Sequence, residues 1–203
     1  MTSENEQKFG PALLILGAPG AGKGTQAKRI AEALNIPAIS TGAIFRQNME
    51  DRTELGIKAK EYIDQGEFVP DSVTNPMVKA RLSAPDTQAG FLLDGYPRTL
   101  DQAYYLREAL AESGRELNVV LEVVVDFDEV LQRLLKRAEI EGRSDDTEPV
   151  IRHRLEVYHA QTEPMVTYYA DRDKLIEVDG KGSVEEVWAR IEDVLVENGL
   201  IEK

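Results

Sequence analysis

The residues best suited to chemistry lie near the start of the chain, in the stretch LLILGAPGAGKGTQAKRI at residues 13–30. Gly17 and Gly22 stand five positions apart, and Lys23 follows directly. Glycines let backbone N–H groups converge on a phosphate without Cβ atoms in the way, and a lysine adds positive charge. An apolar run before them and a helical pattern after them are the context that a phosphate-binding loop requires. This stretch therefore predicts a P-loop that binds the phosphates of a nucleotide.

Two further side chains are candidates for placing a magnesium ion beside those phosphates. The common form of the loop has Ser or Thr directly after the lysine, whereas this chain has Gly24 there and Thr25 one position later. The hydroxyl of Thr25 is the first candidate. Asp94 ends the apolar run FLL, and ligands of open α/β sheets bind at the carboxyl ends of strands. We therefore expect Asp94 near the phosphates, where it would orient magnesium through bound water.

Arginines gather between residues 98 and 154, although acidic residues outnumber basic ones by 37 to 24. The set comprises Arg98, Arg133, Arg137, Arg143 and Arg154. Salt bridges on a solvated helix face would explain any one of them alone. As a set they suit phosphoryl transfer, because its transition state spreads negative charge over the phosphoryl oxygens. Fixed cationic donors stabilise that charge, and no covalent nucleophile is needed.

The elements that must position these residues show as an alternation of apolar runs and helical patterns. Five short runs predict strands at residues 12–16, 38–40, 91–93, 119–125 and 175–178. Their continuous apolar character is typical of parallel strands buried on both faces. Ser183 and Glu186 form a capping box at the start of the last helix. The alternation predicts an α/β fold, a P-loop NTPase-type parallel sheet flanked by helices.

Two stretches fit the alternation less well and are interpreted as insertions. Residues 41–84 hold several helical pieces without a strand, and residues 138–149 have the composition of a polar loop between two helices. Pro164 is expected to kink or break the helix that follows this loop, because proline has no backbone N–H. We expect the aromatic group Tyr158, Tyr168 and Tyr169 to lie in the core.

Composition argues against several classes of function. The net charge of −13 disfavours a nucleic-acid-binding face. The chain has no cysteine, and its two histidines, His153 and His159, lie on different faces of a helix, so we expect no zinc site. No apolar run approaches the ~20 residues of a membrane helix, and the polar start is unlike a signal peptide. We therefore expect a soluble, cytoplasmic protein without nucleic-acid or membrane partners.

Four stretches resemble, in the same order, those of adenylate kinase, a family of nucleoside monophosphate kinases. They are GAPGAGKGTQAK (17–28), ISTGAIFR (39–46), FLLDGYPRT (91–99) and GRSDDTEPVIRHRLEVYHAQTEPMVTYY (142–169). The resemblance runs from about Leu13 to Ile191, and the combination of GKGTQ with DGYPR is highly specific to such kinases. The segment between Arg137 and Arg143 is very short and looks like the short-lid form. The resemblance implies reversible transfer of the γ-phosphoryl group of MgATP to AMP, giving two ADP.

The resemblance also implies a role for each matching residue. ATP would contact Gly20, Ala21, Gly22, Lys23, Gly24, Thr25, Arg133, Arg137 and Gly182. AMP would contact Thr41, Arg46, Val69, Gly95, Arg98, Gln102, Arg143 and Arg154. The catalytic residues would be Lys23, Arg98, Arg137, Arg143 and Arg154. At Ala43 the chain departs from the family, which usually has an acid there near the magnesium waters. That departure bears on magnesium positioning and not on the class of reaction.

A domain organisation follows from the same resemblance. A disordered tail at residues 1–10 would precede a single kinase domain at 11–203. Its core would span residues 11–39, 71–135 and 148–203, with an acceptor-binding helical insertion at 40–70 and a short lid at 136–147. The protein would act as a monomer in adenine nucleotide homeostasis. Two alternatives stay open: a kinase for another monophosphate such as CMP or UMP, and a catalytically silent nucleotide-binding module that kept the P-loop.

Overall fold

The structure is a computed structural model and describes residues 9–141 and 147–202. Five parallel strands form its sheet: β1 (Ala12–Leu16), β2 (Ala38–Ser40), β3 (Phe91–Asp94), β4 (Val119–Val124) and β5 (Leu175–Asp179). Their order across the sheet is β2-β3-β1-β4-β5. After β1 the chain forms β2 at one edge, then β3 between β2 and β1, and later β4 on the other side of β1. Each strand lies within one residue of its predicted bounds. The predicted parallel α/β sheet is confirmed.

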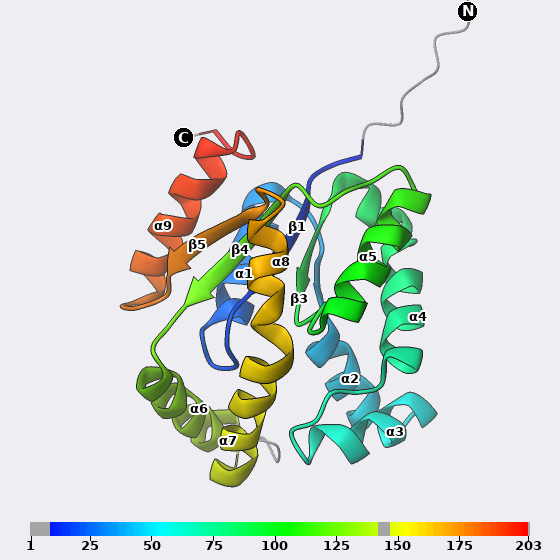
Figure 1. Cartoon of the computed structure of the whole chain (residues 1–203), viewed down its shortest axis with the longest axis vertical. Helices are drawn as coiled ribbons and strands as arrows, with labels where there is room; N and C mark the ends of the chain where they lie inside the picture. Colours follow the sequence, from blue (N-terminus) through cyan, green and yellow to red (C-terminus); the bar gives the residue numbers. More distant parts are fainter. Residues whose placement is uncertain (1–8, 142–146, 203) are drawn as a thin grey trace, which may run out of the picture.

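Helices cover both faces of the sheet (Figure 1). The α-helices are α1 (Lys23–Leu34), α2 (Thr41–Glu50), α3 (Glu54–Ile63), α4 (Asp71–Leu82), α5 (Leu100–Glu112), α6 (Phe127–Glu141), α7 (Glu148–Val157), α8 (Pro164–Ala170) and α9 (Val184–Glu197). Alternate side chains of each buried strand point to opposite faces. Leu13 and Ile15 of β1 accordingly pack with α1 and α9, and Leu14 packs with α4, α5 and α8. Two apolar layers therefore hold the sheet, one on each side.

The long interval between β2 and β3 is helical, as predicted. It holds α2, α3 and α4, followed by a 3₁₀ turn at Pro85–Ala89. Ser40 and Thr53 cap α2 and α3 by accepting hydrogen bonds from backbone N–H groups of their first turns. Phe45, Ala59 and Val69 form a separate small core beneath these helices. The insertion thus has packing of its own, and Figure 1 shows α2 and α3 beyond one end of the sheet.

The bounds predicted for the polar loop, residues 138–149, are wrong at both ends. Helix α6 continues to Glu141, and α7 begins at Glu148. The reason is tertiary packing, because Val130 and Leu134 on the apolar stripe of α6 pack against Ile151 of α7 and support the polar last turn. Residues 142–146, which include Arg143 and the acidic pair Asp145 and Asp146, lie outside the described residues.

The predicted effect of Pro164 is confirmed. Helix α7 ends at Val157, a π-helical turn occupies Tyr158–Thr162, and α8 begins at Pro164 itself. Proline offers no N–H to the carbonyl four residues earlier and its ring crowds that carbonyl, so the helix widens before it resumes. Tyr158, Tyr168 and Tyr169 are all at least nine-tenths buried, as expected.

The N-terminal stretch joins the core earlier than the predicted tail allows. The guanidinium of Arg115 lies 5.1 Å from the centre of the Phe9 ring, and the Gly10 N–H donates to the Gln88 carbonyl at 2.9 Å. Residues 1–8 of that tail lie outside the described residues. Within 9–141 and 147–202, no helix combines the length and apolar character that a membrane span needs.

Glu122 is a partly buried acid on β4, next to the edge strand of the sheet. It is the register partner of Glu177 on the neighbouring parallel strand, so two carboxyl groups stand side by side. Burial, joined by the charges of Glu177 and Glu163, raises the pKa of Glu122 from 4.5 to about 7. The folded state therefore holds this proton more tightly than the unfolded state. Below pH 4.5 both states are protonated, and the folded state loses stability as pH rises from about 4.5 to 7.

Replacing Glu122 by Gln should remove this penalty. We expect Glu122→Gln to raise the free energy of unfolding at pH 8 by about 1–2 kcal/mol, a figure reduced because the side chain is partly exposed. At pH 4.5 the variant and the parent protein should be equally stable. Urea unfolding at both pH values measures this, with the exposed Glu108→Gln as a matched control. A gain of equal size at both pH values would contradict the explanation.

Candidate functional site

A cleft of about 930 Å³ lies at the carboxyl ends of β1 and β3. Most residues predicted to bind nucleotides form its wall: Gly20, Gly22, Lys23, Gly24, Thr25, Thr41, Arg46, Val69, Asp94, Gly95, Arg98, Arg133, Arg137 and Arg154. Parts of the chain more than 100 residues apart thus meet in one place. Ala21, Gln102 and Gly182 are not part of this wall, and Arg143 lies outside the described residues.

The P-loop joins β1 to α1, and its backbone requires glycine. Gly20 and Gly22 have φ values of 86° and 92°, a region that L side chains rarely adopt. A Cβ on Gly20 would also stand 2.7 Å from Cγ of Leu134. No side chain caps the N-terminus of α1, and its first turn holds no acidic residue. The backbone N–H groups there remain suited to an anionic ligand.

Lys23 is the first residue of α1 and reaches back across the P-loop. Its ammonium donates to the carbonyls of Gly17 at 2.8 Å and Ala18 at 2.9 Å. Burial lowers the pKa of Lys23 to about 8, and the charges of Arg98, Arg154 and Arg137 act in the same direction, against Asp94. The wall of the empty cleft therefore carries an excess of positive charge, which negatively charged phosphates would offset.

Arg98 is held through both its side chain and its backbone. Its Nε donates to the Gly95 carbonyl at 2.8 Å, and its backbone N–H donates to Oε1 of Gln102 at 2.8 Å. Its guanidinium also lies 5.1 Å from the centre of the Phe68 ring. Burial lowers the pKa of Arg98 to about 10, and the charges of Arg154 and Arg46 contribute. At neutral pH the group stays charged.

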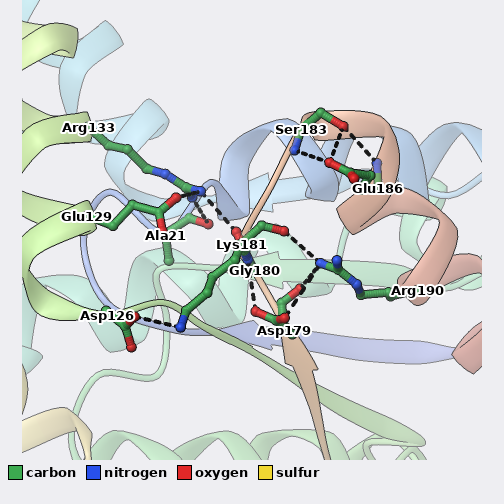
Figure 2. A network of polar contacts seen from close by, with 10 residues as sticks. All are labelled: Ala21, Asp126, Glu129, Arg133, Asp179, Gly180, Lys181, Ser183, Glu186 and Arg190. Carbon is green, nitrogen blue, oxygen red and sulfur yellow. Dashed lines mark hydrogen bonds and ion pairs between the residues drawn. The ribbon is translucent and has the colours of Figure 1, made fainter.

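Beside the cleft, α6, the P-loop and the loop before α9 meet, where the sequence predicts contacts with ATP (Figure 2). Arg133 donates to the carbonyls of Ala21 at 3.4 Å and Gly180 at 3.0 Å, and pairs with Glu129 one turn away. Arg133 thereby joins the three segments. Gly182 belongs to the same loop, two residues beyond the carbonyl that Arg133 contacts.

The loop before α9 is braced by α9 and by the start of α6. Arg190 donates to the carbonyls of Asp179 and Lys181, both at 2.7 Å, and Lys181 pairs with Asp126 at 2.6 Å. The predicted capping box is present, with hydrogen bonds in both directions between Ser183 and Glu186 (Figure 2). The loop is thus held from both sides by protein contacts.

Thr41, on the side of the cleft predicted to bind the acceptor, donates its hydroxyl to the Gly95 carbonyl at 2.8 Å. Gln102, expected beside it, is only 2% exposed. Its Oε1 accepts the Arg98 N–H, and its Nε2 donates to Asp71 at 2.6 Å. In this structure Gln102 supports the floor of the cleft from below. Its predicted contact with the acceptor base stays a prediction.

Sequence reasoning missed several residues of the cleft wall. Phe68 and Thr162 belong to it, and so does Tyr158, which was assigned only to the core. A lone phenylalanine or threonine carries no motif, and its partner Arg98 is distant in sequence. Among the described residues, no group of three or more His, Asp or Glu side chains is arranged to hold a metal ion.

The fold and the cleft define a P-loop protein suited to phosphoryl transfer. A family model described as adenylate kinase matches residues 15–174. The adenylate kinase of Pseudarthrobacter chlorophenolicus is 58% identical over 179 residues, which cover 88% of this chain and 93% of that protein. Those of Clavibacter michiganensis subsp. michiganensis and Thermobifida fusca are 55% and 54% identical over 93% and 88% of this chain, and 94% of each relative is covered. The chain belongs to the adenylate kinase family.

Proposed function

We propose that this cleft transfers the γ-phosphoryl group of MgATP to AMP, giving two ADP, by fixing charges around the moving group. The observation that carries the proposal is the convergence of Lys23, Arg98, Arg137 and Arg154 on one cleft at the end of β1. Burial lowers the pKa of Lys23, and the positive charges of these arginines lower it further. A phosphoryl group in transit would offset these positive charges, and such preorganised charge is a major source of catalysis.

Each side of the cleft then has a task. The P-loop amides and Lys23 hold the donor phosphates, and Arg133 lies where the donor base would be covered. Arg46 and Arg98 hold the acceptor phosphate. Arg137 and Arg154, with Arg143 beyond the described residues, hold the group that moves. Exclusion of water by the insertion and the lid would suppress hydrolysis of ATP. We further propose a monomer located in the cytoplasm.

The proposal is tested by measuring ADP formation with a coupled assay. ADP should form when ATP and AMP are both present, and ATP alone should give almost none. The reverse reaction should give ATP and AMP from ADP. Absence of turnover in a folded protein that still binds ATP would favour the silent nucleotide-binding module instead.

The donor set of the cleft fits a magnesium ion that arrives with ATP. Asp94 stands beside the start of α1, since a Cβ on Gly24 would be 3.8 Å from its Oδ2. Thr25 is exposed in the cleft wall and offers a hydroxyl. Asp94 would hold magnesium through water and Thr25 directly or through water, which suits an ion that keeps part of its hydration shell. Bound there, magnesium would neutralise charge on the donor phosphates.

Asp94→Asn should weaken the positioning of magnesium without unfolding the protein. We expect the Mg²⁺ concentration for half-maximal turnover to rise about 10-fold, while KM for AMP changes little. A titration of turnover with Mg²⁺ at fixed ATP and AMP measures this. Asp101→Asn, an exposed acid on α5, is the control. An unchanged Mg²⁺ requirement would remove Asp94 from the metal site.

A further inference from the structure

Thr162 is a buried polar side chain in the wall of the cleft. It is 6% exposed, and its hydroxyl donates to the main-chain carbonyl of Arg98 at 2.8 Å, across 64 positions of sequence. A buried carbonyl needs a hydrogen-bond partner, and here a side chain from another element supplies it. With Gln102 on the Arg98 N–H, both main-chain polar groups of Arg98 are held by buried side chains.

The position of Thr162 in the fold gives this bond its importance. Thr162 ends the π-helical turn, in which the Glu163 N–H donates to the Tyr158 carbonyl at 3.0 Å, five residues earlier. Such turns are frequent at functional sites. Helix α7, which carries Arg154, enters this turn, and α8 continues from it into the core. The bond from Thr162 therefore ties the base of the Arg154 helix to the turn that carries Arg98.

Arg98 and Arg154 repel each other in the empty cleft. After burial, the charge of Arg154 is the largest cause that lowers the pKa of Arg98. Repulsion of this kind favours movement of α7 away from the Arg98 turn. The stem of Arg154 also lies close to the helical insertion, since a Cβ on Gly66 would stand 2.9 Å from its Cγ. The spacing of the two guanidinium groups thus depends on what holds the base of α7.

We propose that Thr162 is a positioning residue for phosphoryl transfer, which through the Arg98 carbonyl sets the spacing between Arg98 and Arg154. The inference rests on the proposed function of these two arginines. Each guanidinium can attract a phosphate wherever it lies nearby, but transition-state stabilisation needs both at fixed positions. A displacement of about 1 Å can cost up to 10²-fold in rate. Loss of the Thr162 bond should therefore lower kcat more than it raises KM.

The experiment compares two variants of Thr162 that differ in the hydroxyl. Thr162→Val keeps the shape and removes the donor, and Thr162→Ser keeps the donor. We expect kcat to fall about 10-fold in the valine variant, with KM for ATP and AMP changed less than threefold. The serine variant should stay within about threefold of the parent kcat. Melting curves fix an assay temperature at which every variant is folded.

Thr87→Val is the matched control. Thr87 is 1% exposed, and its hydroxyl donates to the carbonyls of Leu82 at 2.7 Å and Ala84 at 2.8 Å, outside the cleft wall. This change should lower the melting temperature and leave kcat unchanged. If Thr162→Val does not fold, Thr162→Ala replaces it, because alanine also removes the donor and leaves room for water.

The outcomes separate this inference from the proposed function. A parent protein that forms no ADP from ATP and AMP overturns the proposed function. A parent protein that is active, with a valine (or alanine) variant within twofold of its kcat, overturns only the role of Thr162. The role of Thr162 is also overturned if the serine variant is as impaired as the valine variant, or if the valine variant changes only in KM. A selective fall in kcat with rescue by serine supports the role.

Discussion

Lys23→Ala is expected to lower kcat by about 10²–10³-fold while the protein stays folded. The ammonium crosses the P-loop to the Gly17 and Ala18 carbonyls, beside the amides at the start of α1. From there it can meet the outer phosphates of a donor nucleotide as a point charge. Removal of the ammonium takes away a positive charge that is fixed in place before the reaction begins. Water in its place would have to reorient to stabilise the phosphate charge, and that reorientation costs free energy.

The stability of the Lys23 variant distinguishes chemistry from structure. Because burial lowers the folded-state pKa of Lys23 to about 8, its charge destabilises the folded protein at neutral pH. That penalty is present below pH 8 and fades as pH rises toward 10.5. Lys23→Met, which keeps the apolar stem, should therefore melt no lower than the parent protein at pH 7. Circular dichroism measures the fold.

Activity is measured on the same samples, with the exposed Lys58→Ala as the control. The parent protein should lose kcat/KM above about pH 8, as Lys23 loses its proton in the free enzyme. In Lys23→Met this alkaline loss should be absent. A folded Lys23 variant with near-parental turnover would refute the P-loop assignment.

The strands and the P-loop were predictable because their signals are local. Each strand is a short apolar run, and burial on both faces of a parallel sheet selects for such runs. The P-loop is a local strand–turn–helix, and β1 and α1 occur where the glycines predict them. The Pro164 break was predictable for the same reason, because a missing N–H acts on its own helix.

The errors and omissions depend on partners that are distant in sequence. The last turn of α6 is polar, and only its packing beside α7 favours a helix to Glu141. Gln102 is bound to Asp71, 31 positions away, and Thr162 to Arg98, 64 positions away. Neither bond has a sequence pattern. Burial of a polar side chain shows only in the folded structure, which revealed both bonds.

The acceptor should be AMP, with kcat/KM far above that for CMP, UMP and GMP. Thr41 and Val69 line the acceptor side of the cleft, and Gln102 lies below its floor. The Gln102 amide is fixed in one orientation, because Asp71 can only accept and the Arg98 N–H can only donate. One N–H of Nε2 is left over. A base that reaches it with its N1 position needs an acceptor there, and adenine N1 is an acceptor whereas guanine N1 carries a hydrogen.

Selectivity built this way is strong, because a wrong base leaves buried polar groups unpaired. A mismatch of this kind can lower kcat/KM by about 10⁴–10⁵-fold, whereas a difference in apolar fit changes kcat/KM by a far smaller factor. We therefore expect GMP and UMP, which present N–H groups at the equivalent edge, to be rejected by several powers of ten. CMP has a ring acceptor, so its rejection depends on the smaller size of the pyrimidine and should be less severe.

The measurement is kcat/KM for the four monophosphates at fixed MgATP, repeated with Asp71→Asn. A neutral asparagine at 71 accepts a weaker hydrogen bond from Gln102 Nε2 than the carboxylate does, so the Gln102 amide is held less firmly. The ratio of AMP to GMP should then narrow, while the melting temperature and the requirement for Mg²⁺ stay close to those of the parent protein. Exposed Asp101→Asn should leave the ratio unchanged. If CMP or UMP matched AMP in the parent protein, the P-loop, the arginines and the mechanism would stand, because they act on phosphate, and only the identity of the acceptor base would have to change.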